Sequence, residues 1–165
     1  MASAPADFAT PDIADEFPDE VAALELPLRN FGGRAQFCGE VVTVKCFEDN
    51  SLVKELVNTP GDGRVILVDG GGSLRRALLG DMLAAAAVDN GWSGLVIDGA
   101  VRDVDPIAVM PLGVKALAAT PLRTDKRGEG QTGIRVKIGG VSVNPGDFVY
   151  ADNNGVLVAS RALLR

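Results

Sequence analysis

Short apolar runs recur along the chain between polar and glycine-containing segments, and they predict strands. Residues 64–68 (RVILV) are apolar almost throughout, which is typical of a strand buried on both faces of a sheet. Residues 35–47 (AQFCGEVVTVKCF) are rich in β-branched and aromatic side chains, and they predict a long strand with a candidate bulge at Gly39. Shorter apolar runs predict strands at 94–97 and 114–119.

Helices are predicted between these strands, each from a polar or proline start signal. Asn50 is a typical N-cap residue, and proline is favoured in the first helical turn because its missing N–H has no partner there. These signals and the spacing of apolar residues predict helices at 11–17, 51–58, 81–89 and 105–110, and one or two helical turns at 73–79.

The last third of the chain has the pattern of β-hairpins, because pairs of short apolar runs flank turns rich in glycine, aspartate and asparagine. The paired runs are 133–138 with 141–143 and 147–151 with 156–159. Residues 121–131 before them are charged and glycine-containing, and they predict a long exposed loop.

The order of these elements, with strands and helices alternating before a run of hairpins, indicates an α/β or α+β fold. We expect a mixed central sheet with flanking helices in a single domain, because the chain shows no repeat and no linker. Residues 1–25 are expected to form an N-terminal segment with a short helix, and residues 26–165 the main domain. Residues 22–34 are expected to be irregular.

A glycine-rich loop, residues 69–73 (DGGGS), directly follows the predicted strand 64–68. Loops at the carboxyl ends of strands are where open sheets bind ligands. The loop is neither a Walker loop nor a dinucleotide fingerprint, because no Gly-Lys-Ser/Thr follows and position 75 is Arg. It is either a flexible turn or a loop whose bare backbone allows close approach of a ligand or another chain.

Composition and charge exclude several function classes. The 165-residue chain carries a net charge of −6 and no run of Lys and Arg, so a direct nucleic-acid interface is not expected. No apolar run has the length of a membrane span, and the first residues lack the features of a signal peptide. We therefore expect a cytoplasmic protein without membrane contact.

The chain has no histidine, which excludes Ser-His and Cys-His nucleophilic catalysis, histidine-bound zinc and a histidine general base. Its two cysteines, Cys38 and Cys46, fall on one predicted strand. Eight positions on a straight strand span roughly 26 Å, far too long for a disulfide. Both are expected to be small core residues, and catalysis would have to use carboxylates, Arg, Lys, Tyr, backbone amides or an oxygen-bound metal.

One stretch concentrates such chemistry. Asp81 begins the alanine-rich helix 81–89, and twenty residues separate it from Arg102, which Asp103 follows. A helix and the following strand return the chain to the same edge of a sheet. We therefore expect Asp81 to lie close to Arg102 and Asp103.

These residue types together suit a 2-oxo acid and a hard cation. The first-turn amides of Met82 and Leu83, and the guanidinium of Arg102, would bind a carboxylate. Asp103 offers an oxygen ligand for Mg²⁺ or Mn²⁺, and one protein carboxylate is enough when substrate and water complete the shell. Asp81 would hold a water or act as a base. A metal at the keto oxygen would stabilise an enolate, the step shared by aldol cleavage and oxaloacetate decarboxylation.

Each part of the pattern also has a plainer interpretation. Arg102 and Asp103 could be a solvated pair in a loop, and Asp81 after Gly80 could simply begin a helix. Only the joint spacing favours a site. A Schiff-base aldolase using Lys115 is a further alternative, although a lysine in an apolar strand more commonly extends its ammonium to solvent or makes an ion pair.

Four stretches resemble the family of the regulator of ribonuclease E activity A (RraA) and 4-hydroxy-4-methyl-2-oxoglutarate aldolase. They are VDGGGSLRRALLGDMLAAAAVDNGWSGLVIDGAVRDV, FGGRAQFCGEVVTVKCFEDN, PLGVKALAATPLRTDKRGEG and GGVSVNPGDFVYADNNGVLV. The specific marker is an aspartate, twenty residues and then Arg-Asp, which Asp81, Arg102 and Asp103 satisfy.

The resemblance implies a swivelling β/β/α domain over residues 26–165, assembled as homotrimers or as hexamers made of two trimers. It implies a substrate site at Gly80, Asp81, Met82, Leu83 and Arg102, with Asp103 on a divalent cation. It further implies that 4-hydroxy-4-methyl-2-oxoglutarate is cleaved to two pyruvates, with oxaloacetate decarboxylation as a second activity.

The resemblance also implies that the site lies at a subunit interface, where an acidic residue of a neighbouring subunit approaches the metal. Glu40 and Glu48 are both candidates for that residue. A second function implied by the family is a protein-binding regulator that inhibits ribonuclease E, which an acidic surface suits. A menaquinone-pathway methyltransferase finds no support, because the sequence has no glycine-rich S-adenosylmethionine loop of the usual form.

Overall fold

The centre of the fold is a nine-stranded mixed sheet, seen in a computed structural model that describes residues 7–164. Its strands follow the order β1-β14-β13-β3-β4-β6-β8-β2, and β10 pairs with β3. The bounds are β1 Val21–Ala23, β2 Arg29–Asn30, β3 Phe37–Lys45, β4 Val65–Asp69, β6 Gly94–Asp98, β8 Gly113–Ala116, β10 Gln131–Thr132, β13 Phe148–Asp152 and β14 Gly155–Ala159. Strands β3, β4, β6 and β8 are parallel.

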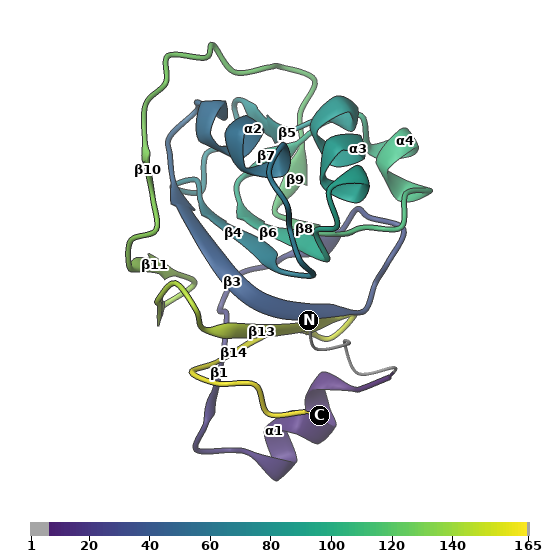
Figure 1. The fold of residues 1–165 in the computed structure, drawn as a ribbon, viewed down its shortest axis with the longest axis vertical. Coiled ribbons are helices and arrows are strands. Elements are labelled where there is room, and N and C mark those ends of the chain that lie inside the picture. The colour runs from purple at the N-terminus through teal and green to yellow at the C-terminus, as the bar shows by residue number, and fades with distance from the viewer. Residues whose placement is uncertain (1–6, 165) are drawn as a thin grey trace.

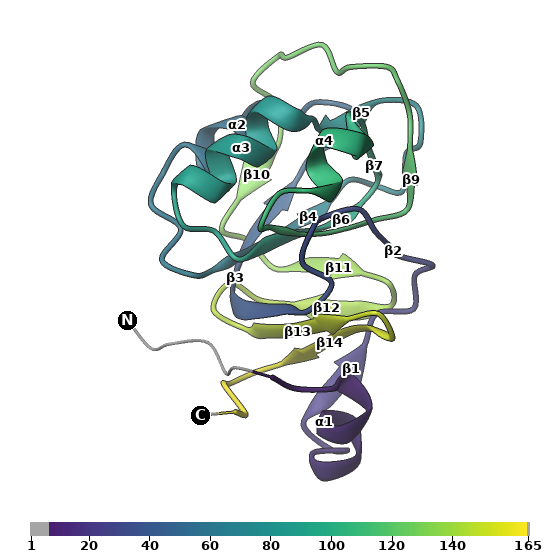
Figure 2. The same ribbon diagram turned by 90° about the vertical axis from the view of Figure 1, so that its right-hand side faces the viewer.

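Helices cover one face of this sheet and a hairpin covers the other (Figures 1 and 2). The helices on the first face are α2 (Ser51–Val57), α3 (Asp81–Asp89) and α4 (Val104–Ala108), and the hairpin consists of β11 (Val136–Ile138) and β12 (Val141–Val143). Helix α1 (Thr10–Glu16) packs against β13 and β14 at the end of the sheet away from the other helices. The structure confirms the predicted mixed sheet with flanking helices in one domain.

Strand β4 shows why the apolar run 64–68 is continuous. Ile66 and Val68 pack in the core beneath the helices, whereas Val65 and Leu67 pack in the core above the hairpins. Successive side chains of a strand point to opposite faces, so a strand between two covered faces needs apolar residues at every position. All four side chains are fully buried, as predicted.

A second, three-stranded parallel sheet lies beyond the carboxyl ends of the central strands. It consists of β5 (Ala77–Leu79), β7 (Ala100–Val101) and β9 (Ala118–Ala119), in the order β5-β7-β9. The helical turns predicted at 73–79 are therefore wrong. Residues 77–79 are buried and pair with β7, and burial in a sheet outweighs the intrinsic helical preference of Ala and Leu.

Several other boundaries differ from prediction for similar reasons. The predicted strand 114–119 is two strands, β8 and β9, because the chain passes from the central sheet to the small one at Leu117. Residues 22–34 were expected to be irregular, but they contain most of β1 and all of β2, which add to the edges of the large sheet. Gly39 does not form the predicted bulge, because its pairing with β13 is in register. Glycine is needed there for space, since a Cβ would lie 2.4 Å from the Gly63 carbonyl oxygen.

The two cysteines of the chain, Cys38 and Cys46, are both buried and free, as predicted. Among residues 7–164, no helix has the length and hydropathy needed to cross a membrane. Residues 1–6 of the predicted N-terminal segment lie outside the described part of the chain.

Candidate active site

The small parallel sheet brings the two halves of the predicted site together. Strands β5 and β7 are adjacent and parallel, with Leu79 paired with Val101, so the residues that follow them emerge at the same edge. The Arg102 amide donates a hydrogen bond to the Leu79 carbonyl oxygen at 2.9 Å. Gly80 and Asp81 therefore lie next to Arg102 and Asp103, by way of short strands that the sequence pattern did not reveal.

Direct contacts join the two segments. The Asp81 amide donates to Asp103 Oδ2 at 3.0 Å, and the Arg102 Nε lies 3.9 Å from the same oxygen. Asp103 is the N-cap of α4 and has a left-handed backbone, with φ 56° and ψ 42°. A non-glycine residue rarely adopts this conformation, and such strain is concentrated at functional sites.

Gly80 is the N-cap of α3 and allows this close approach. A Cβ at position 80 would lie 2.8 Å from Asp103 Oδ2 and 3.5 Å from Arg102 Nε. Glycine is therefore needed here for space rather than for backbone conformation, because its φ is −126°.

These residues line a pocket of about 180 Å³, together with the first turn of α3. The predicted residues Gly80, Asp81, Met82, Leu83, Arg102 and Asp103 all belong to its lining. Among the described residues, the Met82 and Leu83 amides make no hydrogen bond, since the first N–H groups of a helix lack intrahelical partners. Such amides, with the positive end of the helix dipole, attract an anion.

The pocket also contains cationic side chains that the sequence analysis did not assign to it: Lys54, Arg123 and Lys126. With Arg102 they make four basic side chains against two acidic ones, in a chain whose net charge is −6. The pocket is therefore a local concentration of positive charge on an acidic protein, which favours a small anionic ligand.

Two buried polar residues complete the lining, Asn50 and Thr124. Asn50 was predicted only as a helix N-cap, and it is the N-cap of α2, yet its side chain makes no capping hydrogen bond. Instead its Nδ2 donates to the Leu78 carbonyl oxygen, and its Oδ1 accepts from Thr124 Oγ1 at 2.7 Å. It thus connects β5 to the loop of residues 121–131.

Asp103 has the chemistry of an oxygen ligand for a hard cation. Its side chain is 36% exposed, and no hydrogen bond from residues 7–164 reaches its Oδ1. The described residues contain no cluster of three or more His, Cys, Asp or Glu side chains. A single carboxylate suits Mg²⁺ or Mn²⁺, whose other ligands are water and substrate oxygens.

Lys115 lies away from this pocket. It is 2% exposed in β8, and its Nζ donates to the Asp152 carbonyl oxygen at 2.6 Å. Burial lowers the pKa of Lys115, although the nearby Asp152 opposes the effect. The expected solvent-exposed or ion-paired ammonium is therefore replaced by a buried hydrogen bond to the backbone.

The two acidic candidates for a neighbouring subunit differ in their surroundings. Glu40 is exposed on β3. Glu48 is held within its own chain, because its Oε2 accepts hydrogen bonds from Ser73 Oγ at 2.6 Å and from Arg75 Nε at 2.7 Å. These contacts fasten the end of the loop 69–73, where Gly71 and Gly72 have positive φ.

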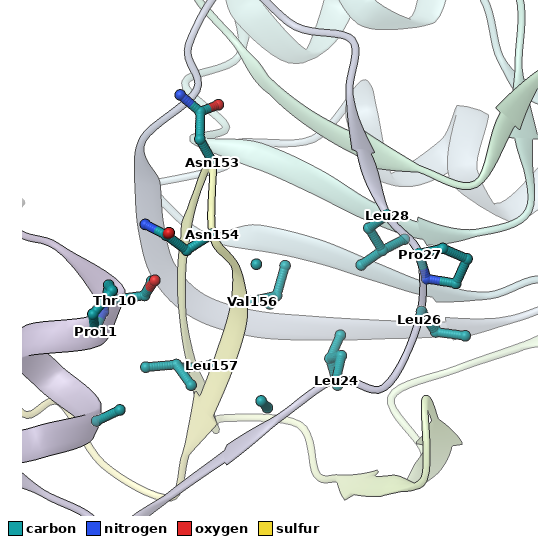
Figure 3. A pocket seen from close by; sticks show the side chains of 13 residues that line it. Thr10, Pro11, Leu24, Leu26, Pro27, Leu28, Asn153, Asn154, Val156 and Leu157 are labelled. Atoms are coloured by element: carbon teal, nitrogen blue, oxygen red, sulfur yellow. The ribbon is translucent and has the colours of Figure 1, made fainter.

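A larger pocket of about 420 Å³ lies between α1, residues 23–28 and the β13–β14 turn (Figure 3). Leu24, Leu26, Leu28 and Leu157 are among its side chains, and no charged residue of the described segment 7–164 lines it. Although larger, it lacks the acids, bases and anion-binding groups found in the pocket at Arg102. We therefore place the candidate active site at the smaller pocket.

Three comparisons bear on the chain as a whole. A family described as RraA-like (Aldolase/RraA) matches residues 10–158. A Pseudomonas aeruginosa protein provisionally named as a 4-hydroxy-4-methyl-2-oxoglutarate aldolase is 60% identical over 156 residues, which is 94% of this chain and 96% of that protein.

Two solved structures are similar throughout. One is described as an S-adenosylmethionine:2-dimethylmenaquinone methyltransferase from Geobacillus kaustophilus, with a TM-score of 0.93 and 44% identity over 94% of this chain and 97% of that one. The other is described as the RNA-processing inhibitor RraA from Thermus thermophilis, with a TM-score of 0.91 and 44% identity over 96% and 98%. The names of these similar proteins point to three different functions.

Proposed function

The chain belongs to the RraA-like (Aldolase/RraA) family, and we propose that it is a divalent-metal-dependent (class II) aldolase. Its substrate in this proposal is 4-hydroxy-4-methyl-2-oxoglutarate, which it cleaves to two pyruvates, and it also decarboxylates oxaloacetate through the same pyruvate enolate. The main support for this proposal is that Arg102, Asp103 and the first turn of α3 line one cation-rich pocket. The 60% identical relative supports the choice of substrate.

Arg102 and the free amides would hold the carboxylate next to the keto group. A guanidinium matches a carboxylate through two parallel hydrogen bonds, and the Met82 and Leu83 amides lie in the same pocket lining. Binding at both ends of the carboxylate fixes the plane of the 2-oxo acid. The bond to be broken then has one orientation relative to Asp81 and Asp103.

Asp81 is the candidate for proton transfer, directly or through one water. In aldol cleavage the hydroxyl at C4 loses its proton and becomes the keto group of the first pyruvate, while the C3–C4 bond breaks and its electron pair forms the enolate of the second. A proton returned to C3 converts that enolate into the second pyruvate. In decarboxylation the electron pair comes from the bond to the departing carbon dioxide, and only the protonation at C3 is needed.

Asp103 would hold Mg²⁺ or Mn²⁺, and such a cation supplies stabilisation of the negative charge that develops on the enolate oxygen. The Asp81 amide restrains Asp103 Oδ2, so the carboxylate is oriented before a cation binds. We further propose a homotrimer or hexamer in which Glu40 or Glu48 of an adjacent subunit approaches the site. Sedimentation analysis of the full chain tests the assembly.

The experiment that tests the activity follows pyruvate release from either substrate, with Mg²⁺ and with EDTA. Because oxaloacetate loses carbon dioxide slowly with free metal ions, a blank without protein is subtracted. The methyltransferase activity named for the Geobacillus relative is not proposed for this chain, because its sequence has no glycine-rich S-adenosylmethionine loop of the usual form.

A second candidate function is regulation of ribonuclease E by direct binding. It is supported by the 44% identity to a protein described as an RNA-processing inhibitor, and by the net charge of −6, which suits a basic partner. A pull-down with purified ribonuclease E tests it, using the wild type and Asp103→Ala. Retention of binding by the variant would separate regulation from catalysis, and no binding by either protein would remove this candidate.

A further inference from the structure

Asp49 is a buried acid whose four hydrogen bonds connect two distant segments of the chain. Its side chain is 2% exposed and does not line the pocket. Oδ1 accepts from the Ser51 amide at 2.9 Å and from Ser51 Oγ at 2.6 Å. Oδ2 accepts from the amides of Arg127 at 2.8 Å and Glu129 at 3.1 Å. One carboxylate thus binds both the start of α2 and the loop of residues 121–131.

The same loop has a second attachment three residues earlier. Thr124 is the buried residue of this otherwise exposed loop, and its Oγ1 donates to Asn50 Oδ1 at 2.7 Å. The Gly128 amide also donates to Ser51 Oγ at 3.0 Å. Residues 49–51 therefore hold the loop on both sides of a short span.

Lys126 lies within that span, between the attachments at Thr124 and Arg127, and Arg123 directly precedes the first attachment. Both line the candidate active site, as does Lys54, which lies one turn into α2 after Ser51. Arg123 is also held by its bridge pairing with Ala77 and by a hydrogen bond from Arg76 Nη1 to its carbonyl oxygen at 3.2 Å. Lys126 makes no hydrogen bond of its own to the described residues, so its place at the pocket depends on the attachments on either side of it.

The network keeps Asp49 ionised. Burial alone would raise the pKa of Asp49, but the hydrogen bonds from Ser51, Arg127 and Glu129 outweigh it and lower the pKa to about 2. A charged acceptor makes stronger hydrogen bonds than a neutral one, so the loop is held by charge-assisted bonds at neutral pH.

We propose that Asp49 is a positioning residue that holds the loop 121–131 so that Lys126 lines the substrate pocket together with Arg102. This inference rests on the proposed function, because it assumes an anionic 2-oxo acid in the pocket. Asp49 would act only through the loop and would touch neither substrate nor metal.

Asp49→Asn tests this with little change of shape. An asparagine side chain has one acceptor oxygen, so it cannot accept from both Ser51 and the loop amides. We expect hydrogen exchange of the segment 123–130 to accelerate at least about tenfold, which corresponds to about 1.4 kcal/mol. The KM for oxaloacetate should rise about tenfold while kcat changes less than about threefold, because ground-state binding is lost.

Asp152→Asn is the matched control. Asp152 is also buried, and it accepts from the Thr10 amide, Thr10 Oγ1 and the Asn154 amide, but it does not line this pocket. It should destabilise the protein similarly while leaving KM and exchange of the segment 123–130 unchanged. If Asp49→Asn fails to fold, Thr124→Val replaces it, because this substitution removes the other attachment of the loop. It should show the same faster hydrogen exchange and higher KM that are expected for Asp49→Asn.

A double-mutant cycle completes the test. If Asp49 acts through Lys126, Asp49→Asn should raise KM little further in a Lys126→Ala background. Full additivity, an unchanged KM, or unchanged exchange of the segment 123–130 in a folded variant would overturn the inference. Hydrogen exchange can be measured without turnover. A wild type without activity would therefore contradict the proposed function, whereas exchange of the segment 123–130 in Asp49→Asn would still decide whether Asp49 holds the loop.

Discussion

The backbone amide of Asp81 donates a hydrogen bond to Asp103 Oδ2 at 3.0 Å, across twenty-one intervening residues. This bond joins the first residue of α3 to the N-cap of α4. It restrains one carboxylate oxygen of Asp103, and no described residue donates to the other. The proposed metal ligand is thus oriented by backbone that also presents the anion-binding amides.

Gly80→Ala should damage the site while preserving the fold. The added Cβ would lie 2.8 Å from Asp103 Oδ2, so Asp103 and Arg102 must move apart from Asp81. We expect kcat/KM for oxaloacetate to fall at least about tenfold, since small displacements of catalytic groups are costly. Thermal unfolding should show a loss of only about 1 kcal/mol, as for an alanine N-cap. Unchanged kinetics would show that this close approach is unimportant.

Arg102→Lys should weaken substrate binding, because an ammonium cannot reproduce the two parallel hydrogen bonds of a guanidinium. A loss of about 1.5–3 kcal/mol corresponds to a rise in KM of roughly 10- to 150-fold. Arg161→Lys is the control, since Arg161 pairs with Glu20 through exposed side chains outside the pocket lining. Equal KM values for the two variants would argue against a carboxylate contact at Arg102.

The sequence predicted most of the fold because its periodic patterns are local. The alanine-rich segment is a helix at Asp81–Asp89, as expected, and the hairpin turns lie where glycines indicated them. Short strands such as β5 and β7 were missed, because two or three apolar residues carry no period and depend on distant partners. Asp81 was expected to meet Arg102 and Asp103 through the predicted strand 94–97. In the structure they meet because β5 and β7 are paired.

The basic half of the pocket was missed for the same reason. Arg123 and Lys126 belong to a segment with the composition of an exposed loop, and most of it is exposed. Arg123 reaches the pocket lining because it pairs with Ala77, and Lys126 because Asp49 binds the Arg127 amide, seventy-eight positions away. A hydrogen bond over that separation leaves no local pattern in a sequence. The position of Lys126 could only be found in three dimensions.

Lys115→Met should leave turnover intact, which distinguishes the metal-dependent proposal from a Schiff-base aldolase. Lys115 is buried in β8 and bonded to the Asp152 carbonyl oxygen. We expect kcat/KM within about twofold of the wild type and a stability loss of about 1–3 kcal/mol for the unpaired carbonyl. Borohydride added with pyruvate should trap no adduct on the wild type, and an adduct on Lys115 would instead favour the Schiff base.

Acid should remove the contribution of Asp49 to stability. Its pKa in the folded protein is about 2, below the ordinary 3.8, so the ionised group stabilises the fold above about pH 4. That contribution is lost as the pH falls from about 4 towards 2. The difference in unfolding free energy between wild type and Asp49→Asn should therefore shrink over this interval in denaturant titrations. A difference that stays constant would mean that Asp49 is not held by charge-assisted bonds.

The most direct test of the central claim is pyruvate formation from oxaloacetate by the wild type and Asp103→Ala, each with Mg²⁺ and with EDTA, after subtraction of protein-free blanks. We expect a wild-type rate that EDTA abolishes and excess Mg²⁺ restores. For Asp103→Ala we expect a rate at least about 100-fold lower. Stability should fall by only about 1 kcal/mol, because the side chain is 36% exposed, although alanine is strained at φ 56° and the bond from the Asp81 amide is lost. An EDTA-resistant rate, or an active Asp103→Ala protein, would contradict the central claim.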